Sequence, residues 1–365
     1  MSRPLQTILA DFIHLSDHRE PIAETKALVE QDPAAILHLI ELLSQMDIEQ
    51  DWKRRQLLNR FLALIWGLDE TARLTIAFEV ARRFYAQVDL RELAEKLCFF
   101  TEADRILEKV LATKEQPPLL AFNRLLIQEL LLRGKTYTET EQHVLRQHLA
   151  DYDQNWLGLS LHELEQDPPL RHYSEHGSSS AILFGLQDAA KLPYTQADDS
   201  PLILQESEDL ALIDLASTIG KEIMQFVSIG QFEGAQNLTD LKAEIICQLQ
   251  HLKTGVASTK MAFKPIEPRD VFRYLFNMSV FGGAYGSGAF GATSRIHTWK
   301  VISGMVQKSY LEHTMDEVLA ELQQYEWTEF SCDNDWFINE WLDLGIIGIH
   351  PTSGKYAVLI ACDTD

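Results

Sequence analysis

Several hallmarks of common protein classes are missing from this sequence of 365 residues. No apolar run approaches the ~20 residues that a membrane-spanning helix needs, and the first residues lead directly into an amphipathic pattern. The four cysteines, Cys98, Cys247, Cys332 and Cys362, lie far apart and form no CxxC pair. We therefore expect a soluble, cytoplasmic protein with reduced thiols, and neither a disulfide framework nor a cysteine zinc site.

Basic residues are scarce in the C-terminal part of the chain. The net charge is −22, with 19 Lys and Arg against 23 Asp and Glu in residues 1–150, and 13 against 31 in residues 151–365. Such an acidic surface repels nucleic acid and anionic lipid and attracts basic protein surfaces. We expect a basic protein partner and no binding to nucleic acid or membrane. Solubility alone would also account for the charge.

Residues 1–155 are predicted to form an all-helical domain. Apolar residues recur at helical spacing in short segments, and Thr101 is placed to cap one helix while Gly134 is placed to end another. Short connections favour antiparallel neighbours. No fixed period and no tetratricopeptide pattern is present. The expected architecture is an antiparallel array of helical hairpins or a helical bundle.

The remainder is predicted to be a linker-like region, residues 156–200, and an acidic α+β domain, residues 201–365. Turn-forming clusters rich in Pro, Gly, Ser and Asp characterise the linker. In the later segments, apolar residues recur at helical spacing in some stretches and at strand spacing in others. Residues 350–355 are predicted to form a hairpin turn. The fold class is thus mainly α, ending in a small antiparallel sheet. The expected helices cover 210–226, 238–252, 269–280, 296–306 and 314–325, and the strands 202–204, 327–330, 336–338, 346–349 and 356–360.

A glycine-rich loop, residues 281–292, is the most unusual stretch, and residues 286–291 match G-x-G-x-x-G. A dinucleotide-binding fold requires a strand before this motif and further strand–helix units after it. The preceding segment has helical spacing, and only 74 residues follow Gly291 in the chain of 365. The context of a dinucleotide-binding fold is therefore missing. A protein-kinase glycine loop does not fit either, because no Val-Ala-Ile-Lys or His-Arg-Asp motif follows.

A simpler anion site remains possible at this loop. Glycine amides at the start of the next helix could form a nest for a phosphate or carboxylate, with arginine for charge, tryptophan for stacking and histidine for proton transfer. In the alternative, Arg295 pairs with an acidic neighbour and Trp299 lies in the core. The candidate ligand-binding residues are Gly283, Gly286, Gly288, Gly291, Arg295, His297 and Trp299.

His172, Glu175 and His176 match the H-x-x-E-H pattern of inverted zinc proteases. That chemistry needs both histidines on one helical face and a further carboxylate ligand. Pro168-Pro169 before the motif and Gly177-Ser178 after it leave room for barely two turns of helix. We keep the match as a metal-site hypothesis and predict no cofactor.

Two groups of residues resemble an uncharacterised bacterial family. One is Gly282-Gly283-Ala284-Tyr285-Gly286 with Arg295 and Trp299, and the other combines residues 341–345 with residues 358–365. The resemblance covers the C-terminal part of the chain. It implies a bacterial origin, assigns no activity, and indicates that the glycine loop and the terminal sheet belong to one module.

No catalytic set emerges from these patterns. We therefore expect a cytoplasmic bacterial interaction protein, which neutralises a basic toxin as immunity proteins do or acts as an adaptor. The alternative is an enzyme or sensor that binds a phosphate-bearing small molecule at the glycine loop.

Overall fold

The structure of the chain is a computed structural model. It describes residues 4–14, 19–46, 51–113, 117–149, 152–173, 179–180, 194–195, 202–217, 224–233, 238–249, 261–282, 288–332 and 343–362.

The chain divides into two compact units. The first comprises Met1–His148 and Arg171–Ser180, and the second comprises Leu149–Leu170 and Ala181–Asp365. The division falls close to the expected boundary at residue 155. The stretch expected as a linker, residues 156–200, is shared between the two units.

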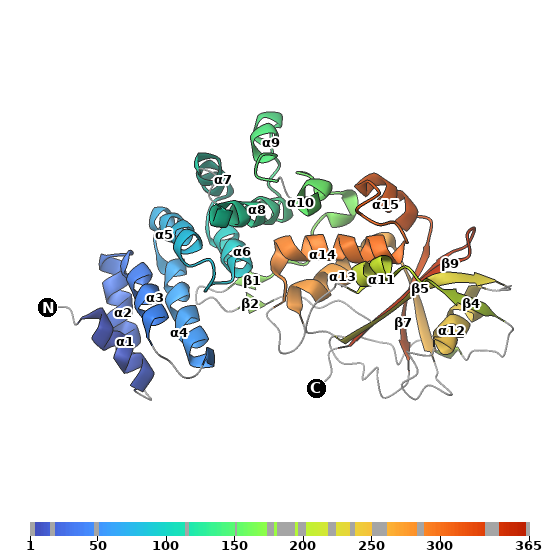
Figure 1. Cartoon of the computed structure of the whole chain (residues 1–365), viewed down its shortest axis with the longest axis horizontal. Helices are drawn as coiled ribbons and strands as arrows, with labels where there is room; N and C mark the ends of the chain where they lie inside the picture. Colours follow the sequence, from blue (N-terminus) through green and yellow to red (C-terminus); the bar gives the residue numbers. More distant parts are fainter. Residues whose placement is uncertain are drawn as a thin grey trace. The chain divides into compact units, whose positions relative to one another are not determined.

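The first unit is the expected helical array (Figure 1). Helices α1 to α4 pack in sequence, each against the next, and α8 contacts α5, α6 and α7. The elements are α1 (Leu5–His14), α2 (Arg19–Gln31), α3 (Ala35–Gln45), α4 (Asp51–Ala63), the 3₁₀ helix η1 (Leu64–Gly67), α5 (Glu70–Arg83), α6 (Leu90–Phe100), α7 (Ala103–Ala112), α8 (Pro117–Leu132) and α9 (Glu139–Leu145), followed by the strands β1 (His172–Tyr173) and β2 (Ser179–Ser180).

Local capping fixes several helix ends in this unit. The Asp69 carboxylate accepts a hydrogen bond from the Ala72 amide, 2.9 Å away, at the start of α5. Gly134 follows α8 at φ 88°, and the Lys135 amide donates to the Leu130 carbonyl, so the expected glycine stop is confirmed. The expected cap at Thr101 is wrong, because α7 begins at Ala103 after Glu102, which makes no capping hydrogen bond.

A short antiparallel hairpin, β1 and β2, belongs to the same unit. The Tyr173 hydroxyl donates a hydrogen bond to the carboxylate of Glu95 on α6, and the Glu95 side chain is fully buried. Burial and the Glu95 charge raise the pKa of Tyr173, so the phenol stays protonated. This contact attaches the hairpin to the helical array.

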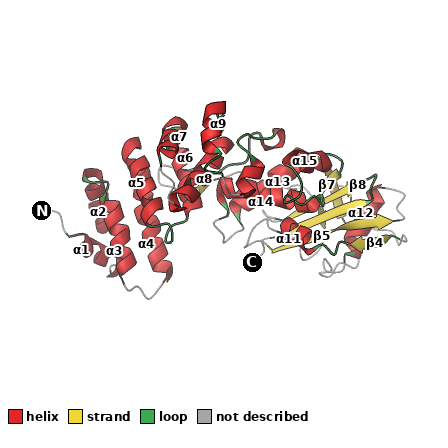
Figure 2. Ribbon diagram, turned by 45° about the horizontal axis from the view of Figure 1, so that its top comes forward, coloured by secondary structure: helices red, strands yellow, loops and turns green. Residues whose placement is uncertain are grey.

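The second unit combines helices with one antiparallel sheet, shown by the yellow strands of Figure 2. Its helices are α10 (Tyr152–Leu157), the 3₁₀ helix η2 (Glu163–Glu165), α11 (Leu210–Ala216), α12 (Leu238–Gln248), α13 (Pro268–Phe281), α14 (Phe290–Met305) and α15 (Met315–Leu322). Its strands are β3 (Tyr194–Thr195), β4 (Ile203–Glu206), β5 (Met224–Glu233), β6 (Met261–Ile266), β7 (Glu326–Cys332), β8 (Leu344–His350) and β9 (Lys355–Cys362).

The strand order is β3-β6-β7-β8-β9-β5-β4, and every described pairing is antiparallel. Phe330 and Cys332 of β7 pack in one core cluster with α12 residues such as Leu241. Trp327 and Glu329 alternate with them, point to the opposite face and are also buried. Helices α11, α13 and α14 lie on that face (Figure 1). The expected α+β class is confirmed, with helices on both faces of the sheet.

Three segments of this unit differ from the expectation. Residues 210–226 were predicted as one helix, but α11 ends at Ala216 and Phe226 belongs to β5. Strands β3 and β6 were not predicted at all. The expected strand at residues 336–338 lies outside the described residues. The hairpin around residues 350–355 is confirmed, because β8 and β9 pair from His350 and Lys355 onward.

None of the described helices is both long and apolar enough to cross a membrane.

Candidate interaction surface

The glycine loop connects α13 to α14, and its described ends meet backbone to backbone. Gly282 ends α13 at φ 73°, and a Cβ atom on Gly282 would lie 2.3 Å from the Cα of Gly288. The Ala289 amide donates to the Ser279 carbonyl at 2.8 Å. The close approach of the two backbone segments therefore explains why residues 282 and 288 are glycines, and no ligand is needed to explain them. Gly283 and Gly286 lie outside the described residues, and Gly291 is buried in the first turn of α14.

Arg295 on α14 and Glu165 of η2 form an ion pair in which both side chains are fully buried. The Nε atom donates to Glu165 Oε1 at 2.6 Å, and Nη2 donates to Oε2 at 2.8 Å. Nη2 also donates to the carbonyl of Ser160 at 2.8 Å. The guanidinium thus has the bidentate geometry that makes such pairs strong.

Two further donors complete the surroundings of the same carboxylate. Trp299 Nε1 donates to Glu165 Oε1 at 2.8 Å, and the His162 amide donates to Oε2 at 2.7 Å. Burial alone would raise the pKa of Glu165, but the Arg295 charge and these hydrogen bonds outweigh it and hold the pKa below its usual value.

The structure therefore brings Arg295 and Trp299 together on a protein carboxylate. His297, two residues after Arg295, is half-buried. Because the Arg295 donors already serve Glu165 and backbone carbonyls, the described part of this region is a structural clamp. It holds the segment around Glu165 to α14.

The H-x-x-E-H match falls largely outside the described residues. His172 lies in strand β1, where the helix required for zinc chemistry is absent, and Glu175 and His176 are not described. Within the described ranges, no group of three His, Cys, Asp or Glu residues is arranged to hold a metal ion.

A different surface emerges at one edge of the sheet. Among the described strands, β4 is the last on its side, and it pairs only with β5, from Ile203 opposite Glu233 to Glu206 opposite Gly230. Two aliphatic side chains next to this edge are largely exposed, Ile203 at 66% and Leu210 at 73%. We call β4 with the start of α11 the acidic edge.

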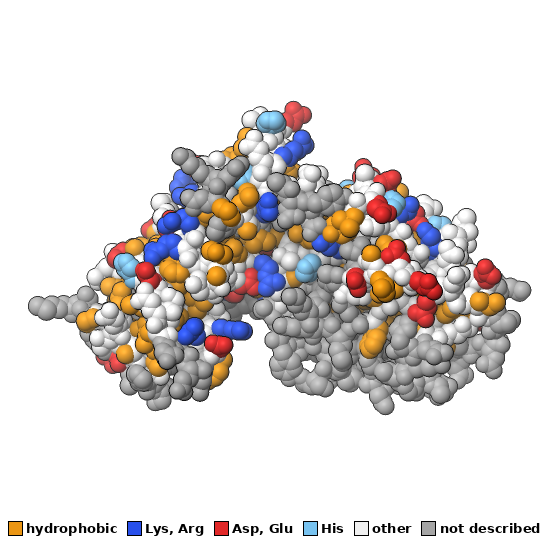
Figure 3. Space-filling model, in the orientation of Figure 1, with side chains coloured by type: hydrophobic (Ala, Val, Ile, Leu, Met, Phe, Trp, Pro, Cys, Tyr) orange, Lys and Arg blue, Asp and Glu red, His pale blue; other side chains and the backbone are white. Residues whose placement is uncertain are grey.

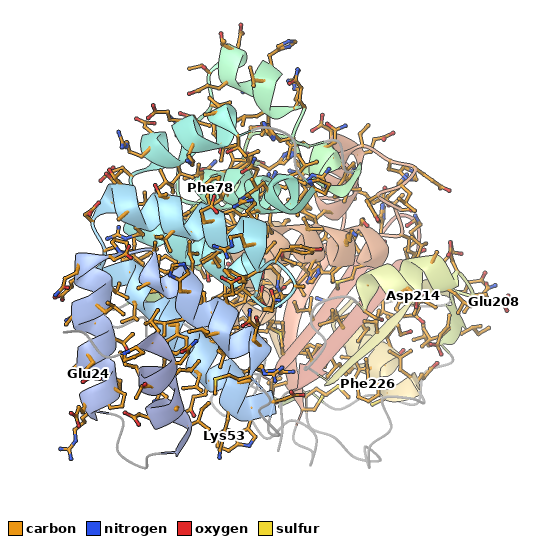
Figure 4. All side chains as sticks on the ribbon, turned by 60° about the vertical axis from the view of Figure 1, so that its left-hand side comes forward. Glu24, Lys53, Phe78, Glu208, Asp214 and Phe226 are labelled. Carbon is orange, nitrogen blue, oxygen red and sulfur yellow. The ribbon has the colours of Figure 1, made fainter. Side chains whose placement is uncertain are left out.

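Exposed acidic side chains lie on the same elements as these two aliphatic residues and on the neighbouring strand β5. Figure 3 shows them in red over β4 and α11, and Figure 4 shows Glu208 just before α11 and Asp214 along it. No Lys or Arg occurs between residues 202 and 220. The exposed acidic residues are Glu206, Glu208, Asp209, Asp214 and Glu233.

The acidic edge is locally well defined. The Asp209 carboxylate accepts hydrogen bonds from the amides of Ala211 and Leu212, at 3.0 and 3.2 Å, and so caps α11. The Ser207 amide donates to the Ile229 carbonyl at 2.7 Å, which extends the β4–β5 pairing into the turn. The exposed aliphatic residues are thus carried on ordered backbone.

Sequence reasoning missed this surface because it joined residues 210–226 into one helix. Asp209, directly before the apolar run that starts at Leu210, is typical of a helix start and marks α11. The neighbour of β4, strand β5, was assigned to that helix, so the edge position of β4 was not recognised. The charge imbalance, in contrast, was visible in the sequence.

No curated protein and no solved structure matches this chain. The expected resemblance to an uncharacterised family is confirmed, and it extends well beyond the C-terminal part. Residues 20–365 match the model of the family of unknown function DUF6183, and the chain belongs to that family.

Proposed function

We propose that this protein is an interaction protein whose second unit binds a basic partner at the acidic edge. The supporting observation is the combination of an edge strand among the described residues, two exposed aliphatic side chains and five exposed acidic residues. A partner segment that adds to β4 would gain backbone hydrogen bonds, and its Lys or Arg residues would meet the acidic rim.

Acidic residues on an edge strand also have a protective role, because charge discourages edge-to-edge aggregation. An edge that is only protected against aggregation would carry polar side chains throughout, whereas Ile203 and Leu210 add exposed apolar area there. Protection alone therefore does not explain these two residues. Exposed aliphatic groups inside a charged rim instead match the composition of a binding surface, with an apolar centre and a polar periphery.

We further propose that the protein acts in the bacterial cytoplasm, where it neutralises a basic toxin or serves as an adaptor. Cys98, Cys247 and Cys332 are free thiols. Burial raises the pKa of the Cys332 thiol to about 12, so this thiol is unreactive at neutral pH. Free, unreactive thiols suit a reducing compartment. The alternative, a phosphate-binding enzyme or sensor at the glycine loop, gains no support from Arg295, whose donors are engaged within the protein.

The test is a capture experiment with the full chain and matched variants. The double variant Glu208→Lys/Leu210→Ser changes one charge and one exposed leucine at the acidic edge. The control Leu311→Ser/Glu312→Lys makes the same changes at another exposed leucine (61%) and glutamate. We expect the wild-type protein and the control to retain one basic protein from a host extract, and the edge variant to lose it. High salt should release the partner.

A partner that is retained equally by the edge variant, or that is not basic, would overturn the proposal. The proposal is also overturned if the wild-type protein retains no partner in an amount nearly equal to its own. Where a partner is retained, binding of the purified partner gives the affinity of each variant directly.

A further inference from the structure

Helix α4 in the first unit is basic although the protein as a whole is strongly acidic. It carries four basic residues, Lys53, Arg54, Arg55 and Arg60, and one acidic residue, Asp51. Its exposed stripe runs from Trp52, which is 61% exposed, through Gln56 and Asn59 to Ala63, at helical spacing. Figure 4 labels Lys53 near the start of the helix, and Figure 3 shows Lys and Arg side chains over it.

Two cavities adjoin the C-terminal half of α4. One, of about 360 Å³, lies among α1, α2, α4 and η1, and the other, of about 440 Å³, lies among α4, η1 and α6. Both are lined by Arg60 and Ala63. The two cavities therefore lie next to one another, with Arg60 and Ala63 between them, and we call the pair the α4 groove.

The two ends of the α4 groove differ in chemistry. The cavity beside α2 has an apolar floor of buried side chains, with Ile22 at its rim. This floor is formed by Phe12, Val29, Phe61 and Leu68. Gly67 opens the same cavity, since a Cβ atom built there meets nothing within 4 Å. Its volume suits one large apolar side chain.

The cavity beside α6 is polar. The exposed carboxamides of Gln56 and Asn59 line it, and each offers both a donor and an acceptor, as a peptide backbone requires. Its two acidic residues already have basic partners, with Asp89 2.5 Å from Arg91 and Glu92 2.5 Å from Lys96.

The charges around the groove consequently favour an anionic occupant. In the apolar cavity, two basic side chains, Lys26 and Arg60, and one carboxylate, that of Glu30, line the walls. Lys53 and Arg55 extend this positive charge along α4. An occupant with Asp or Glu residues beside an apolar anchor would complement both features.

We propose that the α4 groove binds an acidic peptide segment of a partner protein, with one large apolar side chain inserted between α1, α2 and η1. The peptide backbone crosses Gln56 and Asn59, and its acidic residues face Arg60 and Arg55. Helical arrays commonly bind extended segments in this manner, across neighbouring helices. This surface belongs to the first unit and is independent of the acidic edge of the second.

Single-stranded nucleic acid is the main competing occupant, because basic residues with an exposed Trp52 also suit stacked bases. The apolar floor favours a side chain over a base with polar edges. A long polyanion would also be repelled by a protein with a net charge of −22. A second copy of this chain is the other alternative.

The test is a selection of random peptides on the immobilised full-length protein, followed by fluorescence polarisation with the enriched peptides. We expect the enriched sequences to combine two or more acidic residues with an aliphatic or aromatic residue. Gly67→Trp fills the cavity, and Arg55→Glu inverts the charge at an exposed site. Each should weaken binding about tenfold, as expected for loss of one anchor or one charged contact.

Matched controls make the same changes elsewhere on the first unit. Ala112→Trp places the indole at the exposed end of α7, and Arg105→Glu inverts an exposed charge on the same helix. Both should bind the peptides as the wild-type protein does.

The proposal is overturned if no peptide is enriched over the Gly67→Trp protein, if the enriched sequences are basic, or if the controls weaken binding equally. Labelled oligothymidine that binds through Arg55 while the peptides do not would assign the groove to nucleic acid. Dimerisation that Gly67→Trp abolishes, measured by sedimentation, would assign it to a second copy.

Discussion

The Arg295 guanidinium and the Glu165 carboxylate meet through two hydrogen bonds, of 2.6 and 2.8 Å, with both side chains fully buried. Trp299 and the His162 amide saturate the same carboxylate. A buried pair of this kind adds little net stability compared with apolar residues, but removing one partner is costly because the other charge stays buried. The pair thus fixes where the segment around Glu165 lies on α14.

Replacing Arg295 with Met should lower the free energy of unfolding of the second unit by about 3–5 kcal/mol, because Glu165 is left buried without its cation. Urea unfolding followed by tryptophan fluorescence measures this. The control is Arg82→Met, which breaks an exposed pair with Glu79 at 2.6 Å and should cost at most about 1 kcal/mol. If the two variants lose the same free energy of unfolding, the second unit does not depend on Arg295 as the partner of the buried Glu165.

Acid should weaken the second unit through Glu165. The folded pKa of Glu165 lies below its usual value, so the ion pair contributes fully above the unfolded pKa of about 4.3 and is lost as pH falls through the lower folded pKa. The variant Glu165→Gln lacks this titration. We expect it to be less stable than the wild-type protein at neutral pH, with a difference that shrinks in acid. Urea midpoints measured across this pH range would show a constant difference if the idea is incorrect.

The sequence predicted the parts of the fold that depend on local patterns. The helical first unit, α13, α14 and the β8–β9 hairpin each carry their own periodicity and end signals, such as Gly134 and the turn before Lys355. The error at residues 210–226 has a physical reason. Apolar residues of β5 pack on both faces of the sheet, with Phe226 half-buried on one face and Ile229 buried on the other, so the strand lacks the strict alternation of apolar and polar residues.

The candidate sites were harder to foresee, because they depend on residues distant in the chain. Arg295 was among the residues proposed for a ligand site at the glycine loop. Its partner Glu165 lies 130 residues earlier, in a stretch expected to be a linker. No local pattern reports such a pairing. The α4 groove likewise combines α1, α2, α4 and α6, and only the basic composition of α4 was visible in the sequence.

Tyr173→Phe should destabilise the first unit more than Tyr137→Phe. Both phenols are buried donors, but Tyr173 donates to the Glu95 carboxylate, whereas Tyr137 donates to the Ile127 carbonyl at 2.9 Å. Hydrogen bonds to charged groups contribute about 1.5–3 kcal/mol, against about 0.5–1.5 kcal/mol for neutral pairs. Thermal unfolding of the two variants provides the comparison, and equal losses would contradict a charged acceptor at Tyr173.

Gly304→Ala should loosen α11, which carries part of the acidic edge. A Cβ atom on Gly304 would lie 2.5 Å from the Ala216 amide nitrogen and 2.6 Å from the Leu212 carbonyl oxygen, and backbone atoms cannot move aside locally. Overpacking of this kind costs about 1–3 kcal/mol. The matched substitution Gly67→Ala meets open space and should be neutral or stabilise by up to about 1 kcal/mol.

If α11 shifts in Gly304→Ala, the position of Leu210 and Asp214 relative to β4 changes as well. We therefore expect this variant to bind a basic partner more weakly while the rest of the sheet stays intact, which hydrogen exchange of β8 and β9 amides would show. Gly67→Ala, in the other unit, should leave partner binding unchanged. Full binding by a destabilised Gly304→Ala protein would separate α11 from the interaction surface and confine that surface to β4.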